Sequence, residues 1–237
     1  LSDFPGTPRF YGSGFAINDK VYFGTGSVGR EDLADWWEYD INTNSWLQKS
    51  NFSGEGRTGT VAFQIDNMGY LGTGFLWHVD YYHSGFSDFW KYTPSDDKWS
   101  LVTDFPLFDY FGMWWGIAIA NKTDAFIGLG NIRIAGSYRS WMYRYNASSN
   151  TWQRIANYPH ANNSNNGAIG FELAEKIYVK TRYSDSFYYY DSISDTWIKV
   201  KTDILYNYDE GIAFSVGSKA YVGLGLDNQM WEFDPNR

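Results

Sequence analysis

The sequence contains no cysteine and few charged residues for its length. Asp, Glu, Lys and Arg make up 19% of its 237 residues, and the chain contains three histidines. The lack of cysteine excludes disulfides, thiolate zinc sites and cysteine nucleophiles. No apolar run approaches the ~20 residues needed to cross a bilayer, so the visible chain is not expected to insert directly into a membrane.

The charges that are present point away from nucleic acid and from a metal centre. The formal net charge is −8, and an acidic chain repels phosphate backbones. His78, Asp80 and His83 share one segment and could ligate zinc, but their spacing is not the i, i+4 pattern of helical zinc sites. We therefore expect no metal and no cofactor.

Aromatic residues are abundant instead, at 21%, and many recur in a repeated segment. The stretch "DWWEYDINTNSW" at 35–46 returns at 88–99, 141–152 and 186–197, and as a shorter copy at 229–237. Each full copy pairs a tyrosine with a later tryptophan: Tyr39 and Trp46, Tyr92 and Trp99, Tyr145 and Trp152, Tyr190 and Trp197. Aromatic side chains suit a pleated, half-buried surface, so each copy predicts strands.

A second element lies upstream of each copy. It is a short apolar strand that usually ends in paired glycines: "KVYFGTG" 20–26, "MGYLGTG" 68–74, "DAFIGLG" 124–130, "KIYVKTR" 176–182 and "KAYVGLG" 219–225. Another apolar strand precedes each of these across a tight polar turn. Each repeat therefore contains four strands, a to d, and no segment has a helical period.

Four strands per unit with paired glycines and spaced Tyr and Trp columns resemble the kelch repeat, over the whole chain. The fourth copy departs from the pattern, because Lys180 and Arg182 replace the glycines. The resemblance implies an all-β, five-bladed propeller with four antiparallel strands per blade. As one domain, its blades would span about 12–52, 58–105, 112–158, 167–204 and 211–237. The start "LSDFP" matches "VTDFP" at 102–106, so residues 1–4 are expected to supply the missing outer strand of the last blade.

The two ends of the predicted blades differ in composition. The a–b and c–d turns contain no aromatic residue, whereas the b–c and d–a connections are rich in them. These connections hold Phe10, Tyr11, Phe75, Trp77, Tyr81, Tyr82, Phe86, Phe108, Tyr110, Phe111, Trp114, Trp115, Tyr138, Tyr183, Tyr206 and Tyr208. Rigid scaffolds commonly carry function on such loops, so we expect a recognition surface at this end.

The expected function is recognition of a glycan or a partner protein, without catalysis. Aromatic rings can cover the C–H faces of sugars, and Trp, Tyr and Arg dominate protein hot spots. The predicted ligand-binding residues are Arg57, Trp77, Tyr81, Tyr82, Trp114, Trp115, Arg133 and Arg182. Arginine would grip carboxylates beside the rings. We expect an exported or cell-surface bacterial protein whose signal or anchor would lie upstream of Leu1.

Enzymatic alternatives stay open to different degrees. The kelch resemblance includes bacterial propellers that mutarotate sialic acid, a reaction that needs an arginine for the carboxylate and a nearby acid or base. The candidate acids or bases are Glu31, Asp80, Asp109, Asp209 and Glu210. Galactose-oxidase-like copper chemistry is excluded, because that cofactor requires a cysteine. No carboxylate pair can be assigned to a glycosidase from spacing.

Overall fold

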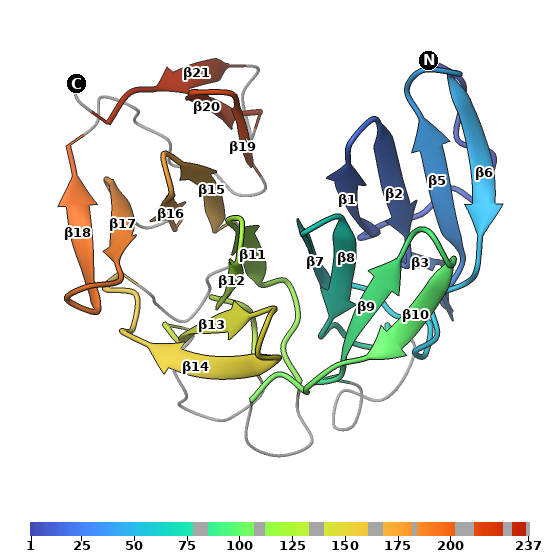
Figure 1. Cartoon of the computed structure of the whole chain (residues 1–237), viewed down its shortest axis with the longest axis horizontal. Coiled ribbons are helices and arrows are strands. Elements are labelled where there is room, and N and C mark those ends of the chain that lie inside the picture. Colours follow the sequence, from blue (N-terminus) through green and yellow to red (C-terminus); the bar gives the residue numbers. More distant parts are fainter. Residues whose placement is uncertain are drawn as a thin grey trace. The chain divides into compact units, whose positions relative to one another are not determined.

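The computed structural model describes residues 1–77, 85–106, 112–132, 140–160, 168–181, 184–201, 211–224 and 229–235. These residues form strands, turns and irregular connections (Figure 1). Within them there is no helix that is long and apolar enough to span a membrane. The all-β prediction is confirmed.

Five antiparallel sheets follow one another along the chain, each in meander order (Figure 1). The first contains β1 (Ser13–Ile17), β2 (Lys20–Gly24), β5 (Trp36–Asp40) and β6 (Ser45–Lys49). The second contains β7 (Val61–Ile65), β8 (Met68–Gly72), β9 (Phe89–Thr93) and β10 (Lys98–Leu101). A short hairpin, β3 (Ser27–Val28) and β4 (Glu31–Asp32), extends the b–c connection of the first sheet.

The remaining sheets repeat the same order. The third contains β11 (Ile117–Ala120), β12 (Asp124–Gly128), β13 (Met142–Asn146) and β14 (Thr151–Ile155). The fourth contains β15 (Ile169–Leu173), β16 (Lys176–Lys180), β17 (Phe187–Asp191) and β18 (Thr196–Val200), and the fifth β19 (Ile212–Val216), β20 (Lys219–Gly223) and β21 (Met230–Phe233). The sheets are the blades of a five-bladed β-propeller, as predicted.

The chain divides into two compact units. Unit 1 comprises Leu1–Trp115 with Ile132–Ile134 and Ala147–Trp152, and contains blades one and two; the rest forms unit 2. In unit 1, Phe15 and Trp36 of blade one pack with Tyr92 and Trp99 of blade two. In unit 2, one cluster joins blades three and four, and another joins blades four and five. Strand-c aromatics thus pack between neighbouring blades.

The repeated Tyr and Trp columns hold the segment that enters each blade. In blade two, the Tyr92 hydroxyl donates to Asp97 at 2.6 Å, and Asp97 accepts the backbone N–H of Ser50 at 3.1 Å. The Trp99 indole N–H donates to the Ser50 carbonyl at 3.3 Å. The same indole-to-carbonyl bond joins Trp152 to Thr103 and Trp197 to Ala156. The repeated motif therefore acts as a clamp, a set of side chains that hydrogen-bonds the backbone of the segment following strand d of the preceding blade.

The N-terminal segment occupies this clamp in blade one. The Ser2 N–H donates to Asn44 at 2.8 Å, the Trp46 indole donates to the Ser2 carbonyl at 3.3 Å, and Phe4 packs on Trp46. Residues 1–5 therefore act like the tail of a preceding strand d, and they are not in a strand themselves. The fifth sheet has three strands among the described residues, so its closure by the N-terminus stays a prediction.

Blade four departs from the repeat at Lys180. In blade one the equivalent residue is Gly24, where a Cβ would lie 2.2 Å from the Asp35 carbonyl oxygen. A side chain at this position therefore requires the ends of strands b and c to separate. The ladder between β16 and β17 accordingly stops at Val179, and the buried Lys180 amine donates to the Ser184 carbonyl at 2.6 Å. Burial lowers the pKa of Lys180 to about 8.

Candidate functional site

A group of aromatic side chains in unit 1 forms the candidate site, which we call the aromatic platform. It consists of Phe10, Tyr11, Phe75, Trp77 and Trp115, from segments at the b–c and d–a end of the blades. Four of these rings form a closed set of neighbours. Ring centroids are 5.8 Å apart for Tyr11–Trp77, Tyr11–Trp115 and Phe75–Trp77, and 5.4 Å apart for Phe75–Trp115. The fifth ring, Phe10, lies 6.4 Å from Tyr11.

The aromatic platform has a buried base and an exposed top. Phe75 is 8% exposed, whereas Trp77 is 45%, Tyr11 48% and Phe10 71% exposed. The Tyr11 and Trp77 rings are stacked, with 30° between their planes. Phe10, Tyr11 and Trp77 therefore present apolar surface to solvent above a base of more buried rings.

Backbone hydrogen bonds fix the segments that carry the rings. Phe10 exchanges two hydrogen bonds of 2.9 Å with Ser27, and the Trp77 N–H donates to the Asp32 carboxylate at 2.9 Å. In blade two, Phe75 is bridged in the same way to Thr58. A surface whose backbone is already bonded loses little conformational entropy on binding.

Two platform residues have a left-handed backbone. Tyr11 has φ of 56° and Trp115 has φ of 53°; each lies two residues before an inner strand. In blade two the equivalent residue is Gly59, with φ of 65°. This conformation costs about 1–2 kcal/mol for a residue with a side chain. Gly59 also lies directly against Trp115, since a Cβ there would be 3.0 Å from the Trp115 Cδ1 atom.

The position of Arg57 differs from the predicted ligand-binding role of this residue. Its side chain is 1% exposed and forms a two-pronged ion pair with Asp88, whose second hydrogen bond measures 3.0 Å. It also donates to the Glu55 carbonyl at 2.9 Å and stacks 3.6 Å from the Phe86 ring centroid. Asp88 accepts the Trp90 indole N–H as well. Arg57 therefore stabilises blade two and is not placed to grip a ligand.

Blade one repeats this buried ion pair. Arg9 donates to Asp35 at 2.5 and 2.7 Å, and Asp35 accepts the Trp37 indole N–H at 2.7 Å. Burial alone would raise the pKa of Asp35, but the hydrogen bonds from Arg9 and Trp37 outweigh it and hold that pKa below its ordinary value. The recurrence in two blades identifies the pair as part of the scaffold.

The other predicted site residues have different outcomes. Trp77 and Trp115 belong to the aromatic platform, whereas Trp114 is only 8% exposed and packs on Phe75, so its predicted role as a contact surface is wrong. Predictions that fall outside the described residues are Tyr81, Tyr82, Arg133 and Arg182. Phe10 and Tyr11 are among the aromatic residues predicted at this end of the blades, but they are not among the predicted ligand-binding residues. Their alignment with Trp114 and Trp115 could have found them.

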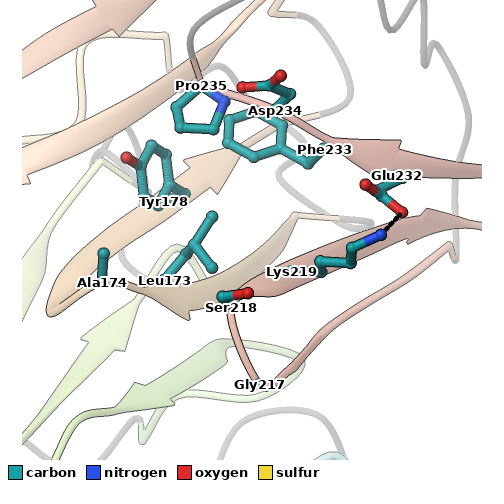
Figure 2. Close-up of a pocket in the computed structure, with 10 residues that line it drawn as sticks. All are labelled: Leu173, Ala174, Tyr178, Gly217, Ser218, Lys219, Glu232, Phe233, Asp234 and Pro235. Carbon is teal, nitrogen blue, oxygen red and sulfur yellow. Dashed lines mark hydrogen bonds and ion pairs between the residues drawn. The ribbon is translucent and has the colours of Figure 1, made fainter.

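Clefts occur at the opposite end of the blades. A cleft of about 650 Å³ lies where the a–b turns of blades four and five meet, with Leu173, Tyr178 and Phe233 along it (Figure 2). Lys219 and Glu232 form an ion pair of 2.8 Å at its side (Figure 2). A cleft of about 630 Å³ occupies the equivalent place between blades one and two. Because the two are equivalent in the repeat, they follow from blade stacking rather than from a dedicated site.

Comparisons with known proteins show the fold. No family model matches the chain, and no curated protein matches it. A similar solved structure is described as the structure of YjhT, with a TM-score of 0.70 and 17% sequence identity. The alignment covers 95% of this chain and 75% of that chain. Likeness at this identity supports the β-propeller fold, and membership of the kelch family stays a prediction.

Proposed function

We propose that this chain is a non-catalytic recognition propeller that binds a glycan on the aromatic platform. The observation that carries the proposal is the exposure of Phe10, Tyr11 and Trp77 above a buried base of rings. Aromatic faces of this kind pack against the apolar C–H faces of sugar rings, while neighbouring polar groups bond the hydroxyls. An exported or cell-surface location accompanies the proposal, since extracellular glycans would be met there.

The size of the exposed surface favours a glycan over a protein. Aromatic side chains bury ~150–250 Å² each when fully covered. At their exposures, Phe10, Tyr11 and Trp77 together present about 350 Å². A stable protein interface uses about 800 Å² per partner. Three rings of this area can cover a few sugar rings, whereas a protein partner would have to contact further residues around them.

The alternative is a sugar mutarotase that acts on a sialic-acid-type substrate. It would need an arginine free to bind the substrate carboxylate. Arg57 is engaged with Asp88, Arg133 and Arg182 lie outside the described residues, and Arg30 is exposed on the β3–β4 hairpin. Recognition ranks first because it needs only the exposed rings that the structure describes. Proton NMR of anomer exchange in sialic acid tests the alternative, which predicts a faster exchange rate when the protein is added.

A glycan array tests the proposed function directly. The intact chain should retain at least one glycan, and Trp77→Ala should weaken that binding about tenfold or more, as expected when ~1.4 kcal/mol of ring contact is lost. Trp231→Ala is the matched control, because Trp231 is 43% exposed on β21 in another blade. Equal loss in both variants, or no loss in Trp77→Ala, would remove the support for this site.

A further inference from the structure

We infer that Asp32 is a positioning residue of the aromatic platform, whose carboxylate holds Trp77 in the orientation that a ligand meets. This inference rests on the proposed glycan-binding function. Asp32 acts through the backbone of Trp77, whose N–H donates to the Asp32 Oδ2 atom at 2.9 Å. Its role is to keep the ring in place rather than to touch the ligand.

Asp32 lies on an element whose backbone is fixed by hydrogen bonds. In the β3–β4 hairpin, Asp32 pairs with Ser27 and Glu31 pairs with Val28. Directly after the hairpin, the Leu33 N–H donates to the Gly26 carbonyl at 2.8 Å. A side chain that projects from such a hairpin starts from a defined backbone position, so the Asp32 carboxylate can hold a neighbouring segment in place.

The same hairpin connects platform segments of two blades. Its Ser27 exchanges two backbone hydrogen bonds of 2.9 Å with Phe10, which precedes β1 of blade one. Its Asp32 bonds Trp77, which follows β8 of blade two and lies 45 residues further along the chain. The Trp77 ring is stacked on Tyr11 at a centroid separation of 5.8 Å. We therefore expect this stack between residues of different blades to depend on the hydrogen bond from Trp77 to Asp32.

The repeat does not require a carboxylate at this position. In blade two, Gly85 is the equivalent of Asp32, because it pairs with Phe75 as Asp32 pairs with Ser27. Glycine has no side chain, so blade two folds without an acceptor there. The buried Arg–Asp ion pairs of the scaffold, by contrast, recur in both blades. The restriction of Asp32 to blade one favours a role at the platform over a role in the scaffold.

The chemistry of the bond suits this role. Hydrogen bonds to an ionised acceptor are shorter and roughly twice as strong as neutral ones. Trp77 is 45% exposed, so ring packing covers only about half of its side chain. If loss of the bond leaves Trp77 in its present orientation for ~10–20% of the time, the apparent affinity for a ligand falls about 5–10-fold.

Fluorine NMR of the intact chain labelled with 5-fluorotryptophan tests the positioning without a ligand. Trp77→Phe assigns the Trp77 resonance. Asp32→Ala should move this resonance toward that of free 5-fluorotryptophan and leave the resonances from outside the platform in place. Asp32→Asn keeps an oxygen that can accept the Trp77 N–H, so it should restore the wild-type position. General unfolding would shift the tryptophan resonances of all blades and is therefore distinguishable from a local effect.

A matched control removes a carboxylate with the same kind of bond elsewhere. Asp191 accepts the backbone N–H of Ile193 at 3.2 Å in blade four. Asp191→Ala should leave the Trp77 resonance unchanged. On the glycan array, the glycan retained by the wild type should bind Asp32→Ala about 5–10-fold more weakly. Asp32→Asn and Asp191→Ala should each change this affinity by less than about twofold.

The outcomes separate the inference from the proposed function. The inference is overturned by an unchanged Trp77 resonance in Asp32→Ala, or by a shift that Asp32→Asn does not restore. It is also overturned by glycan binding that Trp77→Ala weakens and Asp32→Ala does not, and glycan recognition then stays in place. Retention of no glycan, together with the expected shift, would instead overturn the proposed function and leave the hold of Asp32 on Trp77 in place.

Discussion

Replacing Gly59 by alanine tests the packing beneath the aromatic platform, because Gly59 lies against Trp115 and Phe75. With φ of 65°, alanine at this position costs about 1–2 kcal/mol from its backbone alone. Its Cβ would also lie 3.0 Å from Trp115 Cδ1 and 3.2 Å from Phe75 Cε1. Overpacking of this kind costs about 1–3 kcal/mol. Because Trp115 is partly exposed and can yield, we expect a total loss of about 2–4 kcal/mol.

Thermal unfolding, with Gly217→Ala as the control, measures this loss. Gly217 has φ of 60° and nothing within 4 Å of a Cβ, so its substitution carries the backbone term without the ring contact. For a domain of this size, 1 kcal/mol lowers Tm by roughly 2–4 °C. Gly59→Ala should therefore lower Tm by roughly 4–16 °C, and by clearly more than Gly217→Ala. Equal losses in the two variants would refute the placement of Trp115 over Gly59.

Three further substitutions test the scaffold around the site. Arg57→Met removes the ion-pair partner of Asp88, so it should lower the free energy of unfolding by about 3–5 kcal/mol. Urea denaturation measures this loss, and a loss below ~1 kcal/mol would contradict a structural role for Arg57. The lowered pKa of Asp35 stabilises the native state above the unfolded pKa of ~3.9 and is lost as pH falls through the folded value. The stability difference between wild type and Asp35→Asn in urea should therefore shrink below about pH 4, and a constant difference would refute this. Lys180 has a folded pKa of about 8, so between about pH 8 and 10 the unfolded chain binds more protons at this residue than the folded chain. The free energy of unfolding of the wild type should therefore rise over this range. An equal rise in Lys180→Met would refute the burial of Lys180.

The fold could be predicted from the sequence because the Tyr, Asn or Asp, and Trp of the repeated segment recur in each of the four full copies. Tyr92, Asp97 and Trp99 show why: the clamp needs a hydroxyl, an acceptor and an indole at fixed spacing. The acceptor is Asn or Asp in each full copy, and Asp97 has φ of 51°, a conformation that these residues tolerate. Local turn chemistry and tertiary packing thus specify the same spacing, which makes the repeat easy to recognise.

The role of Arg57 could not be read from its local sequence. An arginine among aromatic residues suits ligand binding and burial equally well, and its partner Asp88 lies 31 residues further along the chain, just before β9. A comparison between copies would have distinguished the two. Copies one and two contain both the arginine and the aspartate, whereas Met113 and Trp141 stand at these positions in copy three. Residues that are lost together indicate a mutual contact.

The residue two positions before each inner strand is glycine in blade two and an aromatic residue in blades one and three, and the aromatic choice is not explained by stability. Glycine adopts the left-handed conformation there without steric cost, as Gly59 does. Tyr11 adopts it at a cost of about 1–2 kcal/mol. Full burial of a large apolar side chain would return about 1.5–3 kcal/mol, but Tyr11 is 48% exposed, so its packing returns about half of that. The gain only offsets the strain, and a tyrosine here adds little to folding. Under the proposed function, its contribution is the exposed ring itself, which contacts the rings of both Phe10 and Trp77.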